Sequence, residues 1–230
     1  MRIRTYGCSY TKYIYPTYAD ILGLDNEVVN QGIPGGGNER IFYLLMKDIR
    51  EKKLKKTDAV IVQWSGPHRF DYLQRNNIWL AYGNIINPDN KNARAIWHRI
   101  RSWYNPDYEL EKTYNYVNTT FEILKTYGCK KVYLSLTDLS EQFPQNNFLE
   151  YNMFEKYKGG YEFSGNTFDP NAAFIDDHPT MLEHLDIAQR IAETIGCNVS
   201  SHTERTVKIM DHQIKEDKQF VDRELQPSNR

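Results

Sequence analysis

The sequence predicts an α/β protein built on a doubly wound parallel sheet of about five strands, in three α/β/α layers. Two observations predict this class. Short apolar runs alternate with segments of helical periodicity across residues 1–195. The run from Ala59 to Val62 is continuously apolar, as buried strands of parallel sheets are. Such alternation implies right-handed crossovers, and ligands of these sheets bind beyond the carboxyl ends of the strands.

The first half of the chain is expected to contain three strands and two helices. Asn38 resembles a helix N-cap, because apolar residues recur at helical spacing after it and the segment ends in basic residues. The expected strands lie at residues 3–6, 27–30 and 59–62, and the helices at 18–22 and after Asn38.

The second half adds a long helix, a strand and a final helix. Apolar side chains at helical spacing predict a helix over residues 107–127, which Gly128 ends. Residues 131–136 are expected to form the next strand. A final amphipathic helix is expected from 180 to 195, with its apolar side chains facing inward.

Two long regions, residues 73–105 and 137–175, interrupt this rhythm. Both are rich in aromatic residues and asparagine, and their periodicity is weak. Loops of this length inside a compact domain are usually functional. Because both follow strands at the edge where ligands are expected, we interpret them as insertions that face the substrate. Ordinary surface excursions that cover the core are the alternative.

The C-terminal segment differs from the rest of the chain. It is highly charged from residue 203 to 230, and Val207, Met210, Ile214 and Val221 follow a loose helical pattern. We therefore expect a main domain at 1–200 and a charged helical extension at 201–230. This extension is also the candidate surface for self-association.

Composition limits the classes of function. The formal net charge is −1 with acids and bases well mixed, which argues against a nucleic-acid partner. Three cysteines cannot all pair, and their spacing is not that of metal ligands, so free thiols in a reducing compartment are expected. The sequence shows no apolar leader and no apolar run long enough for a membrane span. We therefore expect no membrane partner and a cytoplasmic location, with association with a virion as an alternative.

Two short segments far apart in the sequence carry the parts of a serine hydrolase. Ser9 follows the first expected strand, and Asp176, Asp177 and His178 precede the final helix. A serine hydroxyl, a histidine base and an acid can act together whatever their order in the chain. Asp176 is the favoured acid, because the side chain of the adjacent Asp177 would have difficulty reaching the imidazole nitrogen. Turn or helix capping is the alternative role for the serine and the two aspartates.

These segments resemble the SGNH (GDSL-like) hydrolases. The run Gly7-Cys8-Ser9-Tyr10-Thr11 is similar to the family's first block, which contains the nucleophilic serine. The run from Val29 to Asn38 is similar to the second block, whose glycine donates a backbone N–H to the oxyanion, and His178-Pro179 is similar to the fifth block. The resemblance spans most of residues 1–195 and implies a flavodoxin-like fold, Ser9 as nucleophile, His178 as base and Gly32 as an oxyanion donor.

The chain also departs from the family pattern. Where the family has a Gly-x-Asn-Asp third block, this sequence reads Gln63 to Arg69 with no asparagine. The position three before His178, usually aspartate in the family, is Ile175. We expect Asn38 or Ser65 to replace the missing oxyanion donor. Arg69 is expected either to bind substrate or to pair with Asp71.

The predicted activity is hydrolysis of a small O-acyl ester, such as an O-acetylated sugar, through an acyl-enzyme. The resemblance implies neither an organic cofactor nor a metal, and the remaining histidines are not spaced as metal ligands. A glycine loop without a P-loop or dinucleotide motif makes a nucleotide or flavin site the weakest alternative. The stronger alternative is a non-catalytic SGNH-fold binding or structural protein, such as a phage-associated component, because the third block is altered and the tail is charged.

Overall fold

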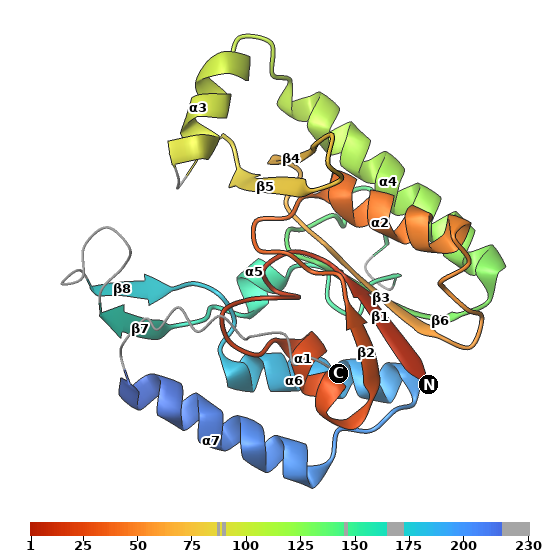
Figure 1. Cartoon of the computed structure of the whole chain (residues 1–230), viewed down its shortest axis with the longest axis vertical. Helices are drawn as coiled ribbons and strands as arrows, with labels where there is room; N and C mark the ends of the chain where they lie inside the picture. The colour runs from red at the N-terminus through yellow and green to blue at the C-terminus, as the bar shows by residue number, and fades with distance from the viewer. Residues whose placement is uncertain (87, 89–90, 145–146, 165–172, 218–230) are drawn as a thin grey trace.

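The computed structural model describes residues 1–86, 88, 91–144, 147–164 and 173–217. Its centre is a sheet of four parallel strands in the order β2-β1-β3-β6 (Figure 1). Ile3 of β1 is in register with Val28 of β2 on one side and with Ala59 of β3 on the other. The strand bounds are Arg2–Tyr6 for β1, Glu27–Asn30 for β2, Ala59–Trp64 for β3 and Lys130–Ser135 for β6.

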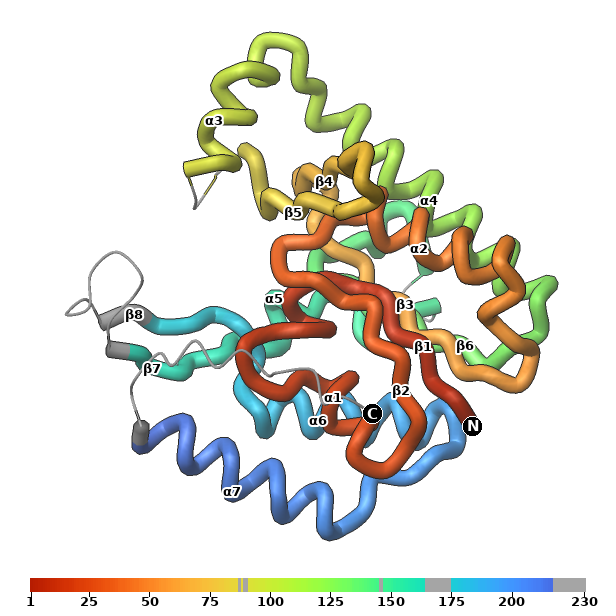
Figure 2. Tube along the Cα trace, in the orientation of Figure 1, coloured from red at the N-terminus to blue at the C-terminus, as the bar shows by residue number. Residues whose placement is uncertain are grey.

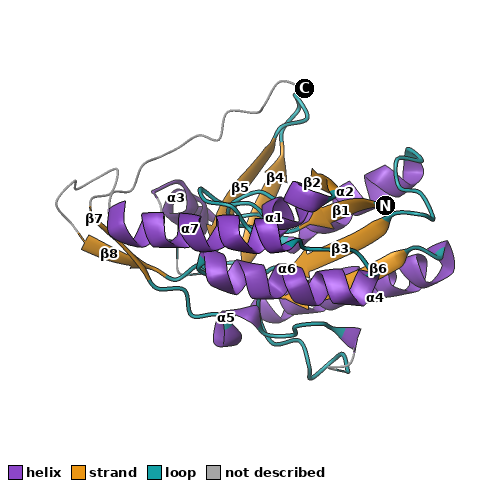
Figure 3. Cartoon of the chain, turned by 90° about the horizontal axis from the view of Figure 1, so that it is seen from below, coloured by secondary structure: helices purple, strands orange, loops and turns teal. Residues whose placement is uncertain are grey.

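Helices cover both faces of this sheet, as Figures 1 and 3 show. Successive side chains of a strand point to opposite faces, so Ile61 joins one apolar core while Val60 and Val62 join the other. The predicted fold class is therefore confirmed. One face carries α1 (Tyr18–Asp25), α6 (Met181–Ile195) and α7 (Ser201–Asp217), and the other carries α2 (Asn38–Arg50) and α4 (Pro106–Tyr127).

Most predicted elements are present, with bounds that differ by a few residues. The strand from Ala59 continues to Trp64, and helix α1 runs to Asp25 rather than ending near Leu22. Beside β6, at the edge of the sheet, a single parallel bridge joins Leu134 to Glu150. Among the described residues the central sheet thus has four strands, and this single bridge stands where the predicted sheet of about five strands would have its fifth.

The prediction that Asn38 caps helix α2 is wrong. The N-cap residue is Gly37, and Asn38 is the first residue of the helix. The carboxylate of Asp71, which reaches the helix from a different strand, accepts the N–H of Gly37 at 2.9 Å and that of Arg40 at 3.2 Å. Two backbone donors at the helix end are therefore satisfied by a tertiary contact, and the side-chain amide of Asn38 is available for another role.

The two irregular regions contain regular secondary structure. The first, residues 73–105, begins where strand β4 (Arg69–Leu73) ends. It includes β5 (Trp79–Asn84), which forms an antiparallel hairpin with β4, and helix α3 (Lys91–Ile100). The second includes helix α5 (Met153–Lys156) and the hairpin of β7 (Tyr161–Ser164) and β8 (Ala173–Asp176). Figure 2 traces both hairpins to the end of the central sheet where its strands finish.

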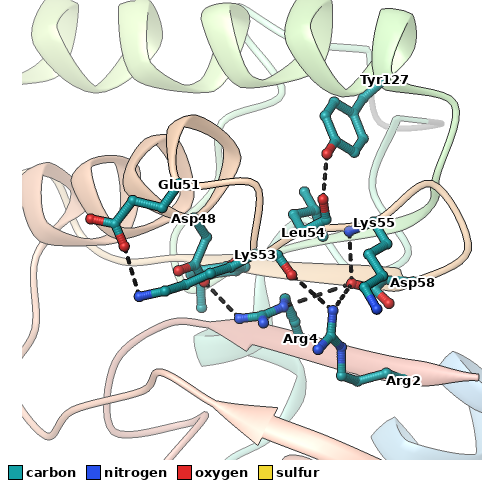
Figure 4. Close-up of polar contacts among 10 residues, drawn as sticks. Arg2, Arg4, Asp48, Glu51, Lys53, Leu54, Lys55, Asp58 and Tyr127 are labelled. Carbon is teal, nitrogen blue, oxygen red and sulfur yellow. Dashed lines mark hydrogen bonds and ion pairs between the residues drawn. The ribbon is translucent and has the colours of Figure 1, made fainter.

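A buried ionic cluster fixes the opposite, amino-terminal edge of the sheet (Figure 4). Arg4 lies 2.8 Å from the carboxylate of Asp48, which also accepts the hydroxyl of Tyr6 at 2.8 Å. Arg2 pairs with Asp58 at 2.7 Å. Burial alone would raise the pKa of Asp58, but the hydrogen bond from Arg2 and the neighbouring charges hold this pKa below its usual range. The cluster joins β1 to α2, through Asp48, and to the segment before β3, through Asp58.

Helix α7 packs its apolar side against the rest of the protein. Val207 is buried, and Met210 and Ile214 contact the core that α6 also lines. The hydroxyl of Tyr161 donates to the buried Asp211 at 2.5 Å. Val221 lies outside the described residues, and the domain division at residue 200 stays a prediction. None of the helices in the described part of the chain is both long and apolar enough to cross a membrane.

Candidate active site

Ser9 lies in a tight turn directly after β1. A side chain at Gly7 would place its Cβ 2.0 Å from the hydroxyl oxygen of Thr11, so only glycine fits where the strand ends. The carbonyl oxygen of the Gln63 side chain accepts the backbone N–H of Cys8 at 3.2 Å and the hydroxyl of Thr11 at 3.2 Å. These bonds tie the turn to β3 and hold Ser9, which is only 4% exposed, at the carboxyl edge of the sheet.

The acid–histidine pair lies where β8 ends. The Nδ1 atom of His178 is 2.7 Å from Oδ1 of Asp176, whereas the nearest oxygen of Asp177 is 3.5 Å away. Asp176 is buried, and the side chain of Asp177 is 71% exposed. A carboxylate at Nδ1 fixes the imidazole tautomer that leaves Nε2 free to act as a base. The geometry therefore favours Asp176 over Asp177 as the partner of the histidine. Neither aspartate caps α6, because Thr180 does so in a capping box with Glu183.

Tyr10 joins the serine turn to the histidine. Its ring centroid lies 5.5 Å from that of His178, and its hydroxyl donates to the backbone oxygen of Asp177 at 3.4 Å. Within the described residues no hydrogen bond links Ser9 to His178, and the serine hydroxyl lies 4.0 Å from the sulfur of Cys8. Catalytic hydrogen bonds are often long before substrate binds, so the missing hydrogen bond does not exclude Ser9 and His178 as catalytic candidates.

Two of the predicted oxyanion donors already have partners in the protein. The N–H of Gly32 donates to the side-chain oxygen of Asn30 at 2.9 Å. The amide of Asn38 donates to the backbone oxygen of Ser65 at 3.0 Å and to the hydroxyl of Thr113 at 3.1 Å. Since both amide hydrogens of Asn38 are used, its side chain fastens α2 to the end of β3 in this conformation.

The segment after β3 contains the other two candidates. Ser65 is fully buried, and its hydroxyl has no hydrogen-bond partner among the described residues. Arg69 lies at the start of β4, where one guanidinium nitrogen is 3.5 Å from the backbone oxygen of Gly36. Its positive charge is close enough to lower the pKa of Tyr10, although burial, the largest effect, and nearby negative charges raise that pKa overall. The predicted alternative, a pair with Asp71, is not among the ion pairs of the described chain.

Arg69 also lines a pocket between α2, α4 and the β4–β5 hairpin. The pocket is polar and aromatic, with both signs of charge on its wall. Next to it, the Nδ1 atom of His68 lies 2.9 Å from the hydroxyl of Tyr104, and burial lowers the pKa of this histidine. The lining residues are Asn38, Glu39, Pro67, Arg69, Phe70, Asp71, Ile85, Tyr104, Glu109, Lys112, Thr113 and Tyr116.

Several residues that contact the acid–histidine pair could not be identified from the sequence. Tyr13 stacks on the imidazole of His178, with ring centroids 3.9 Å apart, and Tyr15 donates to Asp176 at 3.1 Å. Gly159 lies against the backbone of residues 176–178. The cluster of tyrosines soon after the serine was the one available signal, but nothing in the sequence shows which distant residues they contact.

The acid–histidine segment also has the composition of a metal site. Ligand atoms of Asp176, Asp177 and His178 lie within 4.8 Å of one another. The Nδ1 atom of His178 cannot keep its hydrogen bond to Asp176 and bind a metal at the same time. A metal at these atoms and a catalytic acid–histidine pair are therefore mutually exclusive uses of the segment.

The fold and site define an α/β protein with a serine after a parallel strand and an acid–histidine pair at the end of an antiparallel hairpin. No family model and no curated protein matches the sequence. Among solved structures, the chain is similar to a putative lipolytic protein of the G-D-S-L family from Desulfitobacterium hafniense. The identity is 13%, the match covers 84% of this chain and 98% of the other, and the TM-score is 0.44.

A second similar structure is a catalytic mutant of an acetylxylan esterase from Geobacillus stearothermophilus. It is 14% identical, the match covers 87% of this chain and 96% of the other, and the TM-score is 0.46. At such low identities and TM-scores, the case for a function rests on the geometry of the site.

Proposed function

We propose that this protein is a serine esterase that hydrolyses a small O-acyl ester. The observation that carries the proposal is the 2.7 Å contact between His178 and a buried Asp176, next to the turn that contains Ser9. An acid that orients a histidine, beside a serine at the end of a strand, is the arrangement that activates a hydroxyl nucleophile.

The reaction would proceed in two halves. His178 takes the proton of the Ser9 hydroxyl as the oxygen attacks the ester carbonyl, and Asp176 holds the imidazole and stabilises its positive charge. The proton then passes from His178 to the departing alkoxide, which leaves as the alcohol. In the second half, His178 deprotonates a water molecule that attacks the acyl-enzyme, releasing the carboxylic acid and restoring Ser9.

The oxyanion must be stabilised by donors that become available when substrate binds. The backbone N–H groups of Ser9 and Gly32 are the proposed donors, and Gly32 would have to exchange its bond to Asn30 for one to the substrate. Loss of one oxyanion donor typically costs on the order of 10²- to 10³-fold in rate. Ser65 is the better candidate for a third donor than Asn38, because its hydroxyl is unpartnered among the described residues.

An O-acetylated sugar or a similar polar alcohol ester is the proposed substrate class. The pocket beside Arg69 is not lined by Ser9, Asp176 or His178, but its tyrosines and charged groups suit a hydroxyl-rich leaving group better than a lipid chain. Hydrolysis assays with acetylated sugars and with long-chain acyl esters would compare the two classes. Faster turnover of the long-chain esters would contradict this choice.

A fluorophosphonate probe with mass spectrometry tests the reaction. We expect an adduct on Ser9, no adduct in Ser9→Ala, and strongly reduced labelling in His178→Ala. Ser201→Ala and His202→Ala are matched controls on the exposed start of α7 and should label normally. A folded wild-type protein that does not react would overturn the proposal.

A non-catalytic binding or structural role on the same fold, for example in a phage particle, is the second candidate. The engagement of Gly32 and Asn38 by the protein's own groups favours it, because an enzyme needs donors free for the oxyanion. This role predicts an unreactive Ser9 together with self-association through residues 201–230. Light scattering of the full chain and of a variant ending at residue 217, which keeps the packed helix α7, would measure the association.

A further inference from the structure

The loop that follows the nucleophile also contacts the acid–histidine pair. After Ser9 the chain passes through Tyr13 and Tyr15 before α1 begins at Tyr18. The hydroxyl of Tyr13 lies 3.3 Å from Oδ1 of Asp176, and that of Tyr15 lies 3.1 Å from Oδ2. One short segment thus carries the serine and two donors to the acid.

We propose that Tyr13 and Tyr15 are positioning residues that hold Asp176 and His178 in working geometry. The inference rests on the proposed esterase function for its catalytic consequence, but the contacts themselves concern only the acid–histidine pair.

The carboxylate of Asp176 has a hydrogen-bond donor on each oxygen. Oδ1 accepts the backbone N–H of His178 at 3.2 Å, its Nδ1 hydrogen at 2.7 Å and the hydroxyl of Tyr13. Oδ2 accepts the hydroxyl of Tyr15, whose oxygen also lies 3.1 Å from the backbone oxygen of Pro179. A buried carboxylate without such partners would be costly and free to rotate away from the histidine.

Both tyrosines remain donors under working conditions. Burial, followed by the negative charge of Asp176, raises the pKa of Tyr13 and of Tyr15 well above the usual tyrosine value. Each hydroxyl therefore keeps its proton, and a carboxylate can only accept it. The two contacts keep the same direction across the pH range in which a histidine base works.

Tyr13 constrains the imidazole in a second way. Its ring lies nearly parallel to that of His178, at an interplanar angle of 18° and a centroid distance of 3.9 Å. Tyr10 covers the same imidazole at an interplanar angle of 57°. The ring of His178, whose side chain is 20% exposed, is thus limited in rotation while Asp176 fixes its Nδ1 side.

The test compares Tyr13→Phe, Tyr15→Phe and the double variant with Tyr157→Phe. Tyr157 is a matched control, because its buried hydroxyl donates to the carboxylate of Asp186 at 2.8 Å, outside the proposed site. The first readout is the NMR signal of the His178 Nδ1 proton, assigned with His178→Gln. We expect this hydrogen-bonded signal in the wild type and in Tyr157→Phe, and its broadening or loss in the site variants.

The second readout is the rate of Ser9 labelling and of ester hydrolysis. Each single variant should lower kcat on the order of 10- to 100-fold with little change in KM, as expected for a lost hydrogen bond to a charged group that orients the base. Thermal unfolding of all variants measures the structural loss, which Tyr157→Phe should share.

The outcomes separate this inference from the proposed function. If the wild type labels at Ser9 but the folded site variants keep both the proton signal and the rate, the positioning role is refuted and the esterase stands. If the wild type does not label, yet the proton signal is lost in the variants and kept in the control, the positioning role stands and the esterase is refuted.

Discussion

Gly159 lies against the backbone of the acid–histidine segment, and Gly159→Ala is the sharpest test of how that segment is held. Its backbone has φ +69, and a Cβ would lie 2.3 Å from the carbonyl oxygen of His178 and 2.8 Å from that of Asp176. Ordinary contact begins near 3.4 Å, so residues 176–178 would have to move by about 1 Å. The neighbouring bond from Gly160 to Asp176, at 2.9 Å, would be strained by the same shift.

The cost has two parts that a matched variant separates. A left-handed backbone costs an L-residue roughly 1–2 kcal/mol. Gly128→Ala should be destabilised by this amount alone, because φ there is +78 and no atom lies within 4 Å of the added Cβ. Gly159→Ala carries the same cost plus the displacement of the catalytic segment. A misplacement of about 1 Å costs on the order of 10²-fold in rate when the moved group is catalytic.

Urea unfolding and the rate of fluorophosphonate labelling are the assays. We expect both variants to be destabilised, with labelling about 100-fold slower only in Gly159→Ala. Normal labelling by a folded Gly159→Ala protein would refute the reasoning, because His178 would then not depend on this contact. Equal loss of labelling in Gly128→Ala would attribute the effect to stability alone.

Two further substitutions probe buried groups. Burial, followed by the charge of His178, lowers the pKa of His184 to about 3, so this histidine stabilises the fold above pH 6.5 and the gain is lost as the pH falls toward 3. His184→Leu should remove about 1.4 kcal/mol per pH unit from the slope of unfolding free energy in that window; an unchanged slope would contradict this. Asp48→Ala should destabilise the protein by about 3–5 kcal/mol, because it leaves the buried Arg4 without its closest partner. Urea unfolding measures this loss of unfolding free energy. Substitution of the exposed Glu51 by alanine is the control and should change the unfolding free energy little.

The sheet could be predicted from the sequence because each strand is a local pattern. The run from Ala59 is apolar at every position to Val62, which is typical of a buried strand in a parallel sheet. The serine turn and the acid–histidine segment were found for a similar reason, since their residue types are those of a known chemistry. Their closeness in space depends on the β7–β8 hairpin, which lies outside the central parallel sheet and carries the acid–histidine segment.

The parts that were missed depend on contacts between distant residues. The side chain of Asp71, in strand β4, accepts the backbone N–H groups at the start of α2. The local pattern around Asn38 could not show this contact and suggested Asn38 as the N-cap in place of Gly37. The tyrosines that contact Asp176 are far from it in sequence, and no local pattern around them identifies a distant partner. The hairpin of β7 and β8 is short and follows a segment without clear alternation, so propensity alone could not separate it from a loop.

The ionic cluster at the amino edge of the sheet has a consequence for the response of the protein to salt. Arg4 and Asp48 are each about 7% exposed, and dissolved ions screen such interior pairs weakly. The exposed pair of Lys53 and Glu51 lies beside them and is open to screening. Rising ionic strength would therefore weaken the exposed pair of Lys53 and Glu51 but leave the buried pair of Arg4 and Asp48 intact. Strand β1, which leads to Ser9, would stay attached to α2 at low and at high salt concentration.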